Sequence, residues 1–207
     1  AVPGGLVSLR DASMARLFTR LVNDELTQST YPALLAGLGY NLSRTASGFA
    51  INISGYNDKQ ADFLAFVVDQ LLTAPLAKSR FDSIKQSLIR DLENAAKDKP
   101  YNQTLTALND TLLGTSWPAQ AQATLLADLT LDELSSWRSE QFKRLSVRGG
   151  LHGNVALDDA EALADLLITL LPLDRVAHSR PAVTQLPESM DIDLAVDHND
   201  AALLLYV

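Results

Sequence analysis

The residues YNLSRTASGFAINIS, at positions 40–54, carry the pattern from which the architecture of the chain follows. Apolar side chains take every second position on both sides of a small polar turn near residues 46–48, namely Tyr40, Leu42, Phe49, Ile51 and Ile53. Successive side chains of a strand point to opposite faces of a sheet, so this alternation predicts an antiparallel hairpin with one apolar face. We expect helices to cover that face, because burying it removes apolar surface from water.

Helical periodicity precedes the hairpin. Apolar residues recur at helical spacing over residues 13–27 and predict a helix with one apolar stripe. Pro32 then favours the start of a short helical turn that runs through Ala36. Gly37 and Gly39 are suited to ending that turn, since glycine accepts the left-handed backbone found at helix C-termini.

Helices are also predicted after the hairpin. Asn57 is a candidate N-cap for a helix whose apolar stripe covers residues 63–72 and which Pro75 closes. A second amphipathic helix follows over residues 81–92, and leucines over residues 105–113 indicate a third. These segments supply further apolar faces for a common core.

The rest of the chain mixes helix, strand and loop patterns. Thr130 and Glu133 have the spacing of a capping box, which predicts a helix with Leu134, Trp137 and Phe142 facing inward. The remaining patterns predict, in chain order, a loop at 114–119, a strand at 145–151, a helix at 154–171 and strands at 192–196 and 201–207.

The order of these elements indicates an α+β fold, with helices packed on one face of a mostly antiparallel sheet. Three prolines separate the last predicted helix from the last two strands, at positions 172, 181 and 187. We place a domain boundary there, with residues 1–175 forming one α+β domain and residues 176–207 forming a linker and the first strands of a second domain. Because the sequence ends on an apolar strand pattern, we expect it to be part of a longer chain.

The bulk composition disfavours several classes of function. The 207 residues carry a net charge of −8 and no basic cluster that could follow a phosphate backbone, so nucleic acid is not expected as a partner. No apolar stretch reaches the roughly 18 residues needed to cross a bilayer. The absence of cysteine excludes disulfides, thiolate metal ligands and a cysteine nucleophile.

A search for catalytic motifs finds none. A catalytic zinc site needs three strong ligands, and a helical H-x-x-E-H motif supplies two of them. The three histidines, His152, His178 and His198, are isolated from one another and from any such motif. No nucleophile elbow, phosphate-binding loop or dinucleotide fingerprint occurs. We therefore assign no catalytic, metal-binding or cofactor-binding residue in this chain.

For the conspicuous glycines and acidic pairs, a structural interpretation is the stronger one. Gly149 and Gly150 lie in a strand pattern, where close backbone packing explains them better than a phosphate cradle. The acidic pairs at 24–25 and 132–133 are expected on helix surfaces or caps, where solvation explains them.

The two tryptophans differ in what their positions predict. Trp137 falls on the apolar stripe of a predicted helix, so we expect it in the core. Trp117 lies beside Pro118 in a predicted loop, and for this residue core packing and substrate contact both stay open.

Two longer runs carry a family resemblance. They are YPALLAGLGY at residues 31–40 and GFAINISGYNDKQ at residues 48–60. On these runs the chain resembles the third domain of zinc peptidases of the pitrilysin/insulinase family. The resemblance continues through Phe81, the region of Trp117, TLDEL at 130–134 and LHGN at 151–154, so it covers most of the chain.

The resemblance implies a parent enzyme, a zinc metalloendopeptidase of four related α+β domains that close around a chamber for peptides. In that family the zinc and its H-x-x-E-H helix belong to the first domain, and the third domain keeps the fold without the metal motif. We thus expect a non-catalytic domain that helps to enclose peptide substrates and contacts other domains of the same polypeptide. Zinc is expected in the parent enzyme and not in this chain.

Similarity to the pitrilysin branch also implies a periplasmic location, with the cytoplasm as the alternative. Because the chain is acidic overall, complementarity to acidic substrates is not predicted. Two other functions stay open: a scaffold or binding module in a multi-subunit assembly related to processing peptidases, and an independent hydrolase. The hydrolase would need a constellation of perturbed titratable groups, which the sequence does not reveal.

Overall fold

A computed structural model of the chain describes residues 2, 5–174, 183–186, 189–194, 196 and 198–206. Within these residues its elements are, in chain order, α1 (Leu9–Ser29), α2 (Tyr31–Leu35), β1 (Gly39–Thr45), β2 (Gly48–Ser54), the 3-10 turn η1 (Asn57–Lys59), α3 (Gln60–Thr73), α4 (Lys78–Asn94), the 3-10 turn η2 (Ala95–Lys97), α5 (Pro100–Leu112), α6 (Ala119–Asp128), α7 (Leu131–Gln141) and α8 (Leu157–Leu170). The predicted α+β class is confirmed.

The hairpin forms where the alternation predicts it. β1 and β2 pair antiparallel around a turn at Ala46 and Ser47, with Leu42 opposite Ile51 and Arg44 opposite Phe49. Side chains two residues apart share a face of a strand, so Arg44 lies on the same face as the buried Leu42. Arg44 therefore lies on the face of β1 that carries the apolar side chains and that faces the helices.

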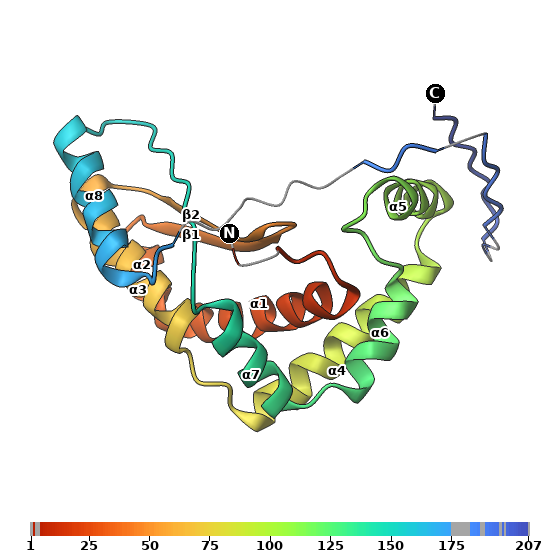
Figure 1. The fold of residues 1–207 in the computed structure, drawn as a ribbon, viewed down its shortest axis with the longest axis horizontal. Coiled ribbons are helices and arrows are strands. Elements are labelled where there is room, and N and C mark those ends of the chain that lie inside the picture. Colours follow the sequence, from red (N-terminus) through yellow and green to blue (C-terminus); the bar gives the residue numbers. More distant parts are fainter. Residues whose placement is uncertain are drawn as a thin grey trace.

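Helix α1 runs beneath the hairpin and supplies the centre of the core (Figure 1). Phe18 is completely buried and contacts three other rings, which come from β2, from α7 and from the residue that follows α7. Its ring centroid lies 5.8 Å from that of Phe49, 6.0 Å from Trp137 and 5.7 Å from Phe142. Burying such a side chain contributes about 1.5–3 kcal/mol, so this aromatic cluster holds α1, the hairpin and α7 together.

The other helices surround α1 in two groups. α4 and α6 pack against each other and against α1, while α3 packs against β2 and α8. In Figure 1, α8 lies with α2 and α3 at one end of the molecule, and α5 lies at the opposite end. α4, α5 and α6 therefore lie on the side of the molecule away from α8.

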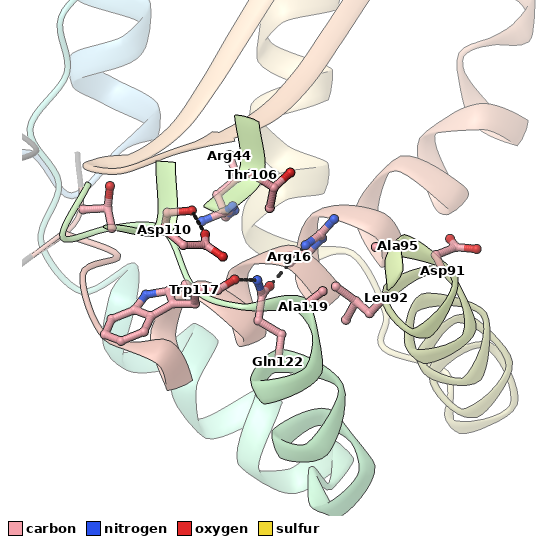
Figure 2. Close-up of a pocket in the computed structure, with 13 residues that line it drawn as sticks. Arg16, Arg44, Asp91, Leu92, Ala95, Thr106, Asp110, Trp117, Ala119 and Gln122 are labelled. Carbon is pink, nitrogen blue, oxygen red and sulfur yellow. Dashed lines mark hydrogen bonds between the residues drawn. The ribbon is translucent and has the colours of Figure 1, made fainter. Parts of the chain in front are cut away.

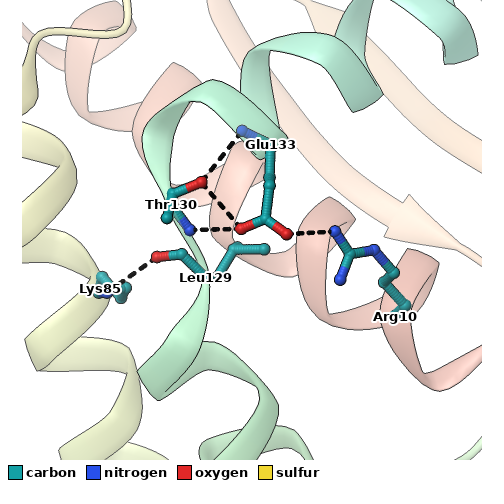
Figure 3. A network of polar contacts seen from close by, with 5 residues as sticks. All are labelled: Arg10, Lys85, Leu129, Thr130 and Glu133. Carbon is teal, nitrogen blue, oxygen red and sulfur yellow. Dashed lines mark hydrogen bonds and ion pairs between the residues drawn. The ribbon is translucent and has the colours of Figure 1, made fainter.

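Polar contacts join the ends of these helices. The capping box predicted at Thr130 is present: the Thr130 hydroxyl accepts the Glu133 backbone N–H, and the Glu133 carboxylate accepts the Thr130 N–H at 2.9 Å. The same carboxylate pairs with Arg10 of α1 at 2.7 Å, and Lys85 of α4 donates to the Leu129 carbonyl at 2.9 Å (Figure 3). The start of α7 is thereby tied to both α1 and α4.

Several predicted boundaries need correction. The N-cap of α3 is Lys59 and not Asn57, because a 3-10 turn precedes the helix. Gly37 has the left-handed backbone (φ +82°) expected after α2, whereas Gly39 is the first residue of β1. The prediction also missed α6, because its buried residues, Gln122, Ala123 and Leu126, make no apolar stripe.

The strands predicted after α7 are wrong for the described residues. Over 145–151 only Leu145 pairs, in an isolated parallel bridge with Leu173, because a strand needs a neighbouring backbone along its length. Residues 192–194, 196 and 201–206 form no strand, and Leu203 is 96% exposed. Residues 195 and 207 of the predicted strands, and Pro181 and Pro187 of the connection, lie outside the described residues.

Within the described part of the chain, no helix combines the length and the apolar character needed to cross a bilayer.

Candidate functional site

A pocket of about 270 Å³ opens between α1, β1, α4, α5, α6 and the loop that joins α5 to α6 (Figure 2). Its polar lining includes two arginines, two aspartates and an amide: Arg16, Arg44, Asp91, Asp110 and Gln122. Trp117 of the connecting loop also lines it. The pocket therefore gathers charged side chains that lie far apart in the sequence.

The secondary structure places both arginines in the pocket. Arg44 is in phase with Leu42 on the helix-facing side of β1, so its guanidinium is half-buried instead of solvated. Arg16 lies one helical turn after Ala12 on α1, and both residues line the pocket. Figure 2 shows the two arginine side chains entering from different elements.

Arg16 is hydrogen-bonded to a neutral side-chain amide. Nη1 of Arg16 donates to Oε1 of Gln122 at 3.1 Å, and Nε2 of Gln122 donates to the Trp117 carbonyl at 2.7 Å. These two bonds fix the amide with its oxygen toward the arginine. Gln122 is only 7% exposed, so the α6 residue holds the Arg16 side chain in place without neutralising its charge.

Both pocket carboxylates already have partners. Asp91 forms an ion pair with Arg20 of α1 at 2.7 Å. Asp110 accepts a hydrogen bond from the Ser116 hydroxyl. Arg44, in contrast, has no hydrogen-bond or ion-pair partner among the residues that the structure describes.

The two guanidinium groups are electrostatically unfavourable where they lie. Burial lowers the pKa of Arg16, and the positive charges of Arg44 and Arg20 lower it further, while Asp91 opposes the shift. Burial also lowers the pKa of Arg44. Both shifts have the same cause, since a charged group that leaves water without a matching countercharge is destabilised.

The first turn of α6 adds to the positive potential. α6 begins at Ala119, which lines the pocket, and its N-cap residue Pro118 makes no side-chain capping hydrogen bond. The N-terminal end of a helix carries a partial positive charge and N–H groups without helical partners. This end of α6 therefore reinforces the two arginines.

Two of the three histidines, His152 and His198, lie in the described part of the chain. His152 is exposed, and His198 is exposed and accepts a hydrogen bond from the Asp200 N–H at 2.9 Å. His178 lies outside the described residues. In the described part of the chain, no three histidine, aspartate or glutamate side chains form a group that could hold a metal ion.

The predictions for the tryptophans and for the glycine pair have different outcomes. Trp137 is 8% exposed and donates from Nε1 to Asp11 at 2.9 Å, which confirms its place in the core. Trp117 lines the pocket, with a buried Nε1 that has no hydrogen-bond partner among the described residues. Close backbone packing at Gly149 and Gly150 is wrong, because a Cβ added at either would meet nothing within 4 Å.

The acidic pairs lie at helix surfaces and ends, as predicted. Asp24 pairs with Arg80 across α1 and α4. Glu133 belongs to the capping box, and the hydrogen bond from Arg10, followed by those from Thr130, lowers its pKa to about 2. Both carboxylates thus join helices, and neither lines the pocket.

The pocket itself was not predicted, because Arg16 and Gln122 are 106 positions apart in the sequence. One signal was available. Arg44 continues the period-two pattern of Tyr40 and Leu42, so an alternating strand predicts a charged side chain on its buried face.

These elements define an α+β domain in which helices cover one hairpin, and comparison with known proteins identifies its type. The family described as the middle or third domain of peptidase M16 matches residues 2–124, more than half of the chain. The chain therefore belongs to the M16 peptidase family, as a middle or third domain. The family resemblance of the 31–40 and 48–60 runs is confirmed.

Full-length relatives agree with this assignment. The chain is 29% identical over 197 residues to insulin-degrading enzyme of Homo sapiens, an alignment that covers 93% of this chain and 19% of the relative. It is 26% identical over 171 residues to the A-factor-processing enzyme of Saccharomyces cerevisiae, covering 83% of this chain and 17% of that protein. The chain thus spans about a fifth of the length of these relatives.

A solved structure supports the fold. The crystal structure of pitrilysin matches with a TM-score of 0.69 over 80% of this chain and 18% of that chain. The sequence identity in this match is 18%, so the match bears on the fold alone.

Proposed function

We propose that the chain is a non-catalytic domain of a pitrilysin-like zinc metalloendopeptidase and helps to form the wall of its substrate chamber. The observation that carries the proposal is the family match over residues 2–124, which is to the middle or third domain of a peptidase. The relatives named as processing or degrading enzymes are about five times as long as this chain. Catalytic residues would then be supplied by other parts of the parent protein.

Zinc in the parent enzyme belongs to the same proposal. A relative in Schizosaccharomyces pombe, 30% identical over 178 residues, has a name that proposes a zinc protease. A catalytic zinc needs three protein ligands and an open position. We propose that an earlier domain supplies these ligands, two of them from an H-x-x-E-H segment, and that residues 1–175 contribute surface and not ligands.

The boundary near residue 175 and a periplasmic location remain parts of this proposal. The alternative is a scaffold or binding module in a multi-subunit assembly related to processing peptidases. The two differ in the reading frame: the peptidase requires an H-x-x-E-H segment several hundred residues upstream, and the scaffold requires a short frame that encodes this unit alone.

The proposal is tested on the full-length protein after its zinc has been removed with a chelator, which allows peptide to bind without being cut. A photoreactive peptide substrate is added, irradiated and located by mass spectrometry. We expect cross-links in residues 1–175 that an excess of unreactive peptide suppresses, and hydrolysis that returns with zinc. Cross-links confined to other domains would contradict the chamber-wall role, and hydrolysis that survives zinc removal would contradict the zinc peptidase.

A further inference from the structure

The arginine pocket has an imbalance that the protein does not resolve by itself. Arg16 is bonded to a neutral amide, Arg44 is half-buried without a partner among the described residues, and the N-terminus of α6 faces the same space. Unpaired charges are rarely buried, since losing hydration without a countercharge is costly. An anion in the pocket would correct this imbalance.

The acidic residues of the pocket do not supply that anion. Asp91 is paired with Arg20. Asp110 keeps its charge, since its bond comes from the neutral Ser116 hydroxyl, but it forms no ion pair with Arg16 or Arg44 in the described part of the chain. Counting Arg16, Arg20 and Arg44 against these two carboxylates leaves one positive charge, in a chain whose net charge is −8. The pocket is therefore a local exception to the acidic surface.

We propose that this pocket binds a carboxylate group, presented by an acidic residue of a peptide. Guanidinium groups present parallel N–H donors that match the two oxygens of a carboxylate, and such charge-assisted bonds are stronger than neutral ones. Arg44 makes the principal bond, Arg16 assists it from α1, and the N–H groups of the first turn of α6 favour the negative charge.

The volume fits this ligand class. The space of about 270 Å³ lies close to the lower end of the roughly 300–1,000 Å³ of small-ligand pockets, so it has room for one side chain or chain terminus and is too small for a folded segment. The pocket would thus recognise one acidic position of a longer peptide. This revises, for one position, the expectation from overall charge that acidic substrates are not favoured.

The inference does not depend on the proposed peptidase function, because the pocket lies entirely within this chain. Binding to the 207-residue chain and cleavage by the parent protein are separate measurements. A chain that binds no carboxylate would therefore contradict only the pocket proposal, and a parent protein that cleaves no peptide would contradict only the proposed peptidase function.

The two tryptophans provide a local readout of binding. Trp117 lines the pocket, whereas the Nε1–H of Trp137 is bonded to Asp11 in the core. The ¹⁵N-labelled chain is titrated with a short blocked peptide that contains one glutamate, and with its glutamine twin. We expect the glutamate peptide to shift the Trp117 indole signal in a saturable and salt-sensitive way, without moving that of Trp137.

Matched variants identify the arginine responsible. Arg44→Gln should weaken binding of the glutamate peptide about tenfold or more, as expected for loss of a charge-assisted bond. The exposed Arg148→Gln should leave the affinity unchanged. Asp110→Asn removes a repulsive charge and should strengthen binding. An unchanged Trp137 signal confirms that each variant is folded.

Three results would overturn the proposal: equal binding of the glutamate and glutamine peptides, equal losses in Arg44→Gln and Arg148→Gln, or binding that appears only in Asp110→Asn. The last result would mean that Asp110 already neutralises Arg44. The same titration on the full-length protein separates the two sources of carboxylate. Retained binding identifies a free peptide as the ligand, and binding lost there but present in the 207-residue chain identifies an acidic residue of another domain as the occupant.

Discussion

The aromatic cluster around Phe18 gives the most direct quantitative prediction about stability. Phe18 lies at the contact of α1, the hairpin and α7, and its side chain is fully buried. Phe18→Ala removes this side chain and leaves a cavity that the surrounding helices and strands can fill only in part. The hairpin and α7 would lose their shared contact with α1.

The magnitude follows from burial and ring contacts. Truncating a buried phenylalanine to alanine costs about 3–5 kcal/mol, which combines lost transfer free energy with the cavity. Phe63 of α3 provides a matched comparison, since it is 5% exposed and has one ring neighbour, Tyr40 at 6.2 Å. Phe18 has three such neighbours, and each pair is worth about 0.5–1.5 kcal/mol beyond burial. The two additional ring pairs of Phe18 mean that Phe18→Ala should cost about 1–3 kcal/mol more than Phe63→Ala.

Urea unfolding followed by circular dichroism at 222 nm measures both variants against the wild-type chain. We expect the midpoint of Phe18→Ala to fall further than that of Phe63→Ala, with similar slopes. A loss below about 2 kcal/mol for Phe18→Ala, or an equal loss for the two variants, would refute the view that this cluster is the centre of the core.

Two further predictions concern pH and backbone geometry. The pKa of Glu133 is lowered to about 2, chiefly by the hydrogen bond from Arg10, so its contribution to stability is complete above about pH 4.5 and disappears as the pH falls toward 2. In thermal unfolding, the wild-type chain should be more stable than Glu133→Gln at pH 7, and this difference should shrink as the pH falls from about 4.5 to 2. A difference that stays constant with pH would contradict this prediction. Gly55 has φ +119°, and an added Cβ would lie 2.2 Å from the Gly37 carbonyl oxygen, so Gly55→Ala should cost at least about 2 kcal/mol in urea unfolding. Gly149→Ala, which meets nothing within 4 Å, should change stability by less than about 0.5 kcal/mol, and equal effects of the two substitutions would show that this close approach is unimportant.

Patterns that repeat locally explain which parts of the fold could be predicted. The hairpin, α1, α3, α4 and α7 were found because their buried residues follow a period of two or of about 3.6. The capping box of α7 was found because its two residues are only three positions apart. In each case the evidence lies within one element.

Features that depend on distant segments escaped prediction. α6 buries Gln122 and the small Ala123, so only the helix propensity of its alanines, glutamines and leucines could have revealed it. The strand predicted at 145–151 has the right residues, but its backbone has a neighbour only at Leu145. The pocket depends on the contact of α1 with α6, which no local pattern encodes.

The resemblance to the family was predicted from long, specific runs and not from a site. The runs at 31–40 and 48–60 lie within the segment that the family matches. They contain Gly37 and Gly55, respectively. The backbone after α2 approaches the end of β2 so closely there that a Cβ on Gly55 would overlap the backbone of Gly37 and Leu38. This geometry gives a physical reason for glycine at Gly55 in a domain of this shape.

We have proposed that this domain is non-catalytic and leaves zinc binding to other parts of its parent. Elemental analysis of the purified 207-residue chain, after equilibration with zinc and dialysis, measures whether the chain itself holds zinc. We expect far less than one zinc ion per chain. One tightly held zinc ion per chain, together with peptide hydrolysis that a chelator abolishes, would contradict it.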